Sequence, residues 1–90
     1  MLSNFFAVNA SSPEVVSKET LSKMNPRQVG QLMKSHGASD ETVTAFEKNE
    51  VAGQVIVDGI TDEDLKEMGF ASGIQRRGIL SMLQMISRDE

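Results

Sequence analysis

Two groups of charged side chains carry most of the chemistry that this sequence of 90 residues could perform. Residues 40–67 hold nine acidic side chains against two lysines, whereas residues 68–88 hold three arginines and no acid. Two of these arginines, Arg76 and Arg77, are adjacent. The planar donor fork of arginine suits paired hydrogen bonds to a carboxylate. The chain is therefore electrically two-sided, with an acidic middle and a basic end, although such charge runs are also common on plain solvated faces.

Other reactive chemistry is poorly represented in the sequence. The chain has no cysteine, and its one histidine, His36, has no visible catalytic partner, so we interpret it as structural. No phosphate-binding loop of the G-x-x-x-x-G-K type is present. Residues 58–64 are acidic but lack the alternating ligand spacing of a calcium loop. We therefore expect no enzyme activity, cofactor, metal or small-molecule substrate.

The composition is that of one small folded domain. Apolar residues make up 39% of the chain and charged residues 24%, which is typical of a globular fold. Residues 1–23 break any helical period, so we expect a flexible N-terminal extension. Its Phe5 and Phe6 either pack on the domain, stay free in solvent or bind a partner. The sequence shows neither a targeting signal nor an apolar run of about 20 residues that could span a membrane. The net charge of −4 also opposes non-specific binding to acidic membranes and nucleic acid. Because no targeting or membrane-spanning segment is visible, we expect a cytoplasmic location.

Capping residues and apolar spacing predict five helices after residue 23. Asn25 and Pro26 start the first helix, which ends before Gly37; Ser39 caps the second, which ends near residue 49. The β-branched run at residues 51–57 has no partner strand, so a short helical turn at 53–57 is favoured over a strand. The fourth helix follows Thr61, which with Asp64 resembles a capping box, and it ends at Gly69. Ser72 and Gln75 have the spacing of a second capping box, which predicts the start of the last helix. The last is the longest, spanning about residues 73–88, with Gly78 inside it as a point where a neighbouring backbone could pack closely.

Three stretches of the sequence, in this order, resemble the sterile alpha motif (SAM) family. The first is residues 25–33, NPRQVGQLM, and the second is residues 46–53, FEKNEVAG. The third and most specific is residues 60–70, ITDEDLKEMGF, followed by GIQRRGIL at 73–80. Two tryptophans that are frequent in the family are replaced by Met24 and Leu32, and a frequent glycine is replaced by Ile74. The resemblance implies an all-α fold: a five-helix SAM-like bundle over residues 24–88 with a loosely ordered arm.

The resemblance also implies protein–protein association through two surfaces, in a signalling or scaffold protein. One is the end-helix surface at the start of the last helix: Gly73, Ile74, Gln75, Arg76 and Arg77. The other is the mid-loop surface: Glu47, Glu50, Val55, Asp58, Asp62, Glu63 and Asp64. The partner would be another SAM domain, either a copy of this chain or a different one. The alternative is RNA-hairpin binding through Arg27, Lys34, Arg76 and Arg77, which the overall acidity and the lack of Tyr and Trp oppose.

Overall fold

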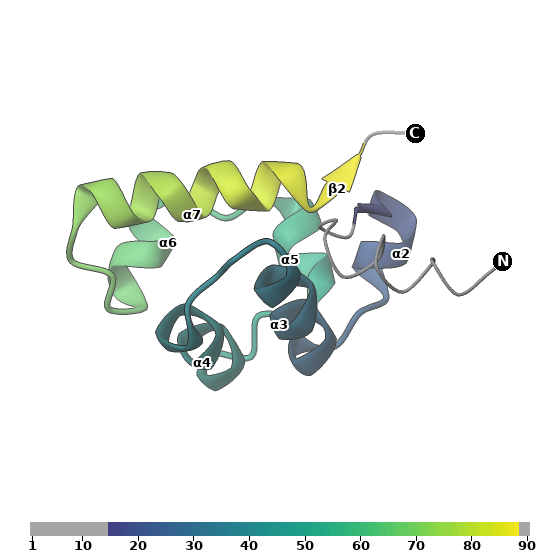
Figure 1. Cartoon of the computed structure of the whole chain (residues 1–90), viewed down its shortest axis with the longest axis horizontal. Helices are drawn as coiled ribbons and strands as arrows, with labels where there is room; N and C mark the ends of the chain where they lie inside the picture. The colour runs from purple at the N-terminus through teal and green to yellow at the C-terminus, as the bar shows by residue number, and fades with distance from the viewer. Residues whose placement is uncertain (1–14, 89–90) are drawn as a thin grey trace, which may run out of the picture.

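The computed structural model describes residues 15–88, and over these residues the chain is an all-α bundle (Figure 1). Its helices are α2 (Lys18–Ser22), α3 (Pro26–Ser35), α4 (Asp40–Lys48), α5 (Gly53–Asp58), α6 (Asp62–Glu67) and α7 (Gly73–Met85). Two very short strands, β1 (Val16–Ser17) and β2 (Ser87–Arg88), pair in parallel. No helix in this described part of the chain is long and apolar enough to cross a membrane. The predicted helical bundle is confirmed, with one helix more than expected.

Local capping signals fix where the helices begin. Asn25 caps α3 through a reciprocal pair of hydrogen bonds with Gln28, and Pro26 occupies the first turn as predicted. Thr61 and Asp64 form the predicted capping box of α6, with the Asp64 carboxylate accepting from the Thr61 amide at 2.9 Å. At α7 the predicted box is only half formed among the described residues, because the Ser72 hydroxyl accepts from the amide of Gln75 without a reciprocal bond.

Three helices end in the same hydrogen-bonded turn, in which the chain reverses through a left-handed residue. After α3 and α6 this residue is the predicted glycine, Gly37 (φ 89°) and Gly69 (φ 105°). After α4 it is Glu50, with φ 55°, and the amide of Val51 donates back to the carbonyl of Phe46 at 3.0 Å. Glu50 is the one non-glycine residue with positive φ among residues 15–88.

Apolar side chains from every helix, and from the loops between helices, form a single core, to which α5 contributes the partly buried Ile56 and Val57. Phe46 and Phe70 lie at its centre with ring centroids 6.4 Å apart. The buried hydrophobic residues are Leu21, Val29, Leu32, Met33, Val43, Phe46, Val51, Leu65, Phe70, Ile79, Leu83 and Ile86. They include Leu32, which replaces one of the tryptophans of the family, and Met24 packs against the same cluster. The apolar spacing that predicts α3, α4 and α7 in the sequence therefore corresponds to helix faces that pack inward.

The β-branched run at residues 51–57 does not form a strand; α5 spans Gly53–Asp58, in agreement with the helical turn predicted at 53–57. The first residue of this helix, Gly53, is buried, and its amide donates to the carbonyl of Met24 at 2.9 Å. A Cβ atom added at Gly53 would lie 1.6 Å from the carbonyl oxygen of Leu21. The backbones of α2 and α5 are thus packed against each other with no room for a side chain between them.

The structure differs from the expected N-terminal arm over residues 15–23. Here Val16 and Ser17 pair with the C-terminal segment, α2 follows, and Leu21 is fully buried in the core. The remaining part of the predicted arm, including Phe5 and Phe6, lies outside the described residues. The last helix is also shorter than predicted, because the chain becomes extended at Ser87 to pair with β1.

Candidate functional site

A groove of about 360 Å³ lies between α5 and α6 and combines an apolar floor with acidic and amide side chains. We call it the mid-loop groove, and its lining residues are Asn49, Val51, Val55, Ile60, Asp64, Glu67 and Met68. Val55 is 43% exposed, a large value for a valine, whereas Val51 is buried and anchors the groove to the core. An exposed apolar surface next to carboxylates can hold an apolar side chain of a partner and attract a cation at the same time.

The structure brings only part of the predicted mid-loop surface into this groove. Val55 and Asp64 line it together, and Glu50 lies between two of its lining residues in the sequence. The other four predicted residues lie elsewhere. Asp58 accepts a hydrogen bond from Gln54 at 2.9 Å, and the Glu47 carboxylate lies against α3 beside Gly30. Glu63 is exposed in the first turn of α6, where Asp62 also lies.

The conformation of Glu50 is costly for an ordinary side chain. Left-handed backbone costs a non-glycine residue roughly 1 kcal/mol or more, and glycine fills the equivalent position after α3 and α6. The carboxylate of Glu50 is exposed and makes no hydrogen bond or ion pair among the described residues. It therefore adds negative charge beside the mid-loop groove at some expense of stability.

The two arginines at the start of α7 have different environments. The Arg76 side chain is only 12% exposed, and its Nε donates to the Asp62 carboxylate at 2.8 Å. Its Nη1 also donates to the carbonyl oxygens of Phe70 and Ala71, at 2.8 and 2.9 Å. Arg76 therefore ties α6, the α6–α7 loop and α7 together, and its charge is largely satisfied within the domain.

Arg77 is exposed and forms no ion pair with the rest of the described chain. Ile74, one turn earlier on the same side of α7, is 79% exposed, the largest value among the exposed large hydrophobic residues. Gly73 is also exposed and Gln75 is half-buried. The end-helix surface thus presents one apolar and one cationic side chain outward, while its third prominent residue, Arg76, is held inward.

The contact between Asp62 and Arg76 joins one residue of each predicted surface within the same molecule. Because of this contact, the charges that remain available for intermolecular pairing are Arg77 on one surface and the groove carboxylates on the other. It also bears on RNA binding, since Lys34 is likewise paired, with Asp40 at 3.2 Å. Two of the four cations considered for phosphate contact are therefore paired with acids of the domain.

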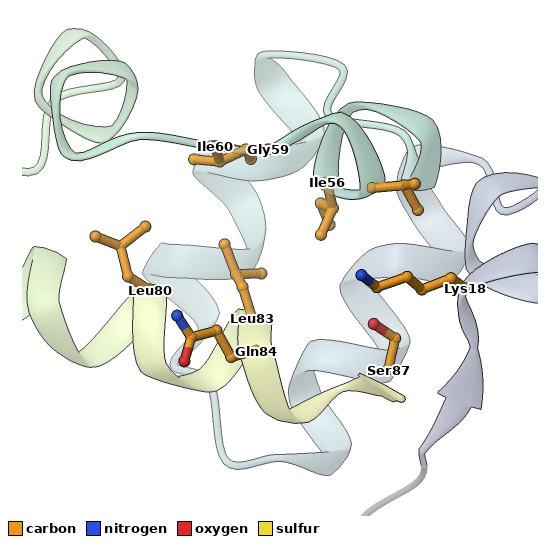
Figure 2. Close-up of a pocket in the computed structure, with 9 residues that line it drawn as sticks. Lys18, Ile56, Gly59, Ile60, Leu80, Leu83, Gln84 and Ser87 are labelled. Atoms are coloured by element: carbon orange, nitrogen blue, oxygen red, sulfur yellow. The ribbon is translucent and has the colours of Figure 1, made fainter. Parts of the chain in front are cut away.

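Two further hollows are lined in part by residues of α7, and one of these two has a predicted site residue in its lining. One of about 370 Å³ separates α5 from the C-terminal half of α7; Figure 2 shows Lys18 and Ser87 at one end and Leu80 and Ile60 at the other. The other, of about 220 Å³, lies where His36 and Thr42 face α7 and includes Gln75 and Gly78. Among the described residues, no group of three acidic or histidine side chains is arranged to hold a metal ion.

The sequence analysis missed three important features of the site. Glu67 and Met68 line the groove beside Asp64, and their spacing of three and four residues from Asp64 along α6 could have indicated it. The inward-facing role of Arg76 has no such local signal, because it depends on how the α6–α7 loop turns. The left-handed conformation of Glu50 could have been found by aligning its place after α4 with Gly37 and Gly69.

Comparisons with known proteins identify the family. The model of the SAM domain (sterile alpha motif) matches residues 24–86, which is more than half of the chain. Searches of curated proteins and of solved structures give no match. SAM domains are protein-interaction modules and are generally non-catalytic. The match covers all three stretches quoted above together with helices α3 to α7, and the chain therefore belongs to the sterile alpha motif family.

Proposed function

We propose that this SAM domain binds another SAM domain by placing the end-helix surface of one molecule against the mid-loop groove of the other. The observation that carries the proposal is the groove itself, in which exposed Val55 lies beside the carboxylates of Asp64 and Glu67. This chemistry complements the start of α7, where exposed Ile74 lies next to Arg77.

The apolar and charged contacts would have separate roles in such a complex. Burying Ile74 against Val55 removes apolar surface from water, which supplies affinity. Arg77 facing Glu67 and Asp64 would steer the encounter and fix the orientation more than it holds the complex together. The positive start of the α7 dipole adds to the charge of Arg77. Glu50, on the rim of the groove, extends its negative field.

Because the two surfaces differ, the interface is head-to-tail. If both partners are copies of this chain, each bound molecule leaves one surface open and the assembly grows into an open chain unless the rotation closes a ring. If the partner is a different SAM domain with only one matching surface, growth stops at a pair. Either form suits a cytoplasmic signalling or scaffold protein, which is the setting we propose.

The test uses two charge reversals and their mixture. Arg77→Glu removes the cation of the end-helix surface, and Glu67→Arg reverses the groove. Glu67 is preferred to Asp64, whose carboxylate closes the cap of α6. Each variant alone should remain near 9.8 kDa by light scattering at low salt. Their equimolar mixture should reach twice that mass, because each chain keeps one intact surface, and it should not grow further.

The matched control is Glu41→Arg, which reverses an exposed carboxylate of α4 outside both surfaces and should associate like the unmodified chain. If no form changes mass with concentration, homotypic association is excluded, and binding to a different SAM domain is then tested by using the same variants to compete for it. Binding to an RNA hairpin that weakens steeply with salt and is lost in Arg77→Glu would overturn the proposal in favour of RNA recognition.

A further inference from the structure

The residue that ends the turn after α4, Glu50, is poorly suited to its backbone conformation. Helices α3, α4 and α6 end in the same hydrogen-bonded turn, and after α3 and α6 the left-handed residue of this turn is glycine. In left-handed backbone a Cβ atom lies close to the following carbonyl oxygen, so glycine or asparagine is usual there. Residues 46–51 would therefore form this turn more easily with glycine or asparagine at position 50.

The charge of Glu50 is also unfavourable where it lies. It follows the C-terminal end of α4, where the final carbonyl groups carry partial negative charge and a basic residue is preferred. Glu47, three residues earlier, carries the same charge, and both side chains are exposed. Lys48, in the last turn of α4, forms no ion pair with either carboxylate among the described residues. Backbone conformation and charge thus both oppose glutamate at this position.

Contacts within residues 15–88 do not compensate these two costs. The Glu50 carboxylate makes no hydrogen bond or ion pair with this part of the chain. Its backbone, in contrast, is fixed by two hydrogen bonds of 3.0 Å, from the Glu50 amide to the carbonyl of Glu47 and from the Val51 amide to the carbonyl of Phe46. Phe46 and Val51 are both buried, so the turn cannot relax without moving the core. An unfavourable residue that the fold does not use is typical of a functional site.

The location of Glu50 indicates which function it serves. The residues on either side of it, Asn49 and Val51, both line the mid-loop groove. One groove carboxylate, that of Asp64, already accepts a hydrogen bond from the Thr61 amide within the cap of α6. The Glu50 carboxylate has no such bond and is available to a cation of a molecule that docks in the groove.

We propose that Glu50 is a specificity-determining residue of the mid-loop groove, and that its carboxylate pairs with the cationic end-helix surface, around Arg77, of a second copy of this chain. The inference rests on the proposed function and adds a residue outside the groove lining. A bound cation relieves the repulsion between Glu50 and the neighbouring carboxylates, so the arrangement that destabilises the free domain strengthens the complex. The fixed backbone also reduces the conformational entropy lost on binding.

The binding test uses two chains that can associate only one to one. The Arg77→Glu chain keeps the groove, and the Glu67→Arg chain keeps the end-helix surface. Changes at position 50 are made in the Arg77→Glu chain, and its Kd for a fluorescently labelled Glu67→Arg chain is measured at low salt. Glu50→Gln removes the charge and should raise this Kd about threefold to fivefold, the effect of one exposed ion pair. Glu50→Asp keeps the charge, and Glu41→Gln removes a carboxylate outside both surfaces, so both should bind like the parent chain.

Thermal unfolding of the same Arg77→Glu chains, followed by circular dichroism, measures the cost to the free domain. Glu50→Asn should raise the midpoint by about 4 °C, because asparagine tolerates left-handed backbone and removes the charge from the end of α4. Glu50→Gln keeps the backbone cost and should raise the midpoint less. Lys48→Asn is the matched control within the helix and should lower the midpoint, because asparagine is the poorer helix former and the cation of the last turn is lost.

The possible results separate this inference from the proposed function. A parent pair that binds, with Glu50→Gln binding equally well, would overturn the inference and leave head-to-tail association intact. A Glu50→Asn chain that is no more stable than its parent would also contradict the inference, because glutamate would then carry no cost at this position. A parent pair that does not bind would exclude association between copies of this chain, and the role of Glu50 with it.

Discussion

The junction of α2 with α5 and the outer face of α7 both contain a glycine within a helix, but the reasons for these glycines differ. At the junction, a Cβ on Gly53 would overlap the backbone of Leu21, so the fold requires glycine there. On the outer face of α7, the space around Gly78 is open. Contacts within the molecule explain the glycine at position 53, and no such contact explains the glycine at position 78. The comparison separates residues that build the domain from residues that are available to a partner.

The largest expected effect is at the junction. Gly53→Ala forces the added methyl group onto the carbonyl of Leu21, so α5 or α2 must shift and the bond from the Gly53 amide to Met24 is strained. We expect the free energy of unfolding to fall by about 3 kcal/mol or more. Urea unfolding followed by circular dichroism measures this, since the chain has no Trp or Tyr for fluorescence. An effect below about 1 kcal/mol would mean that α2 and α5 are not in close contact.

The second prediction compares the inner and outer arginines of α7. Arg76→Met keeps the apolar stem but removes the bonds to Asp62, Phe70 and Ala71, so we expect a loss of about 2 kcal/mol of unfolding free energy. Arg77→Met is the matched control on the exposed side and should change stability by no more than about 0.5 kcal/mol. Equal losses in the same urea experiment would contradict the distinction between the two residues.

The smallest effect has the opposite sign. Gly78→Ala adds a methyl group into open space within a helix, and alanine is the better helix former, so unfolding free energy should rise by about 1 kcal/mol. The measurement is made at low protein concentration, where the monomer dominates. A destabilised Gly78→Ala monomer would show that this glycine is required by the fold, and the contrast with Gly53 would disappear.

Features with a local signal were predictable from the sequence, and features that depend on distant residues were not. Asn25 with Pro26, and Thr61 with Asp64, fix helix starts because the capping side chain and the amide it binds lie within one turn. Helix α2 has five residues and one buried side chain, Leu21, which is too little to show a helical period. Its order depends on packing against Gly53, about thirty residues later.

The candidate site also combines features that have a local sequence signal with features that depend on distant residues. The local charge excess directed attention to the stretch from α4 to α6, but a charge count cannot distinguish Asp62, paired within the domain, from Glu67 in the groove. That distinction arises from the turn between α6 and α7, which brings Arg76 back onto Asp62. Exposed Ile74 and Val55 are apolar residues in helices, and their sequence spacing alone does not show that they point outward.

The pairing of β1 with β2 brings both ends of the described chain to one corner of the domain. In Figure 1 this corner lies across the molecule from α6 and the start of α7. A fluorophore or immobilisation handle attached near Val16 or Ser87 would therefore leave the groove and the end-helix surface accessible. When the domain is tethered at both ends, a stretching force would first load the two strands and not the helices that form the proposed binding surfaces.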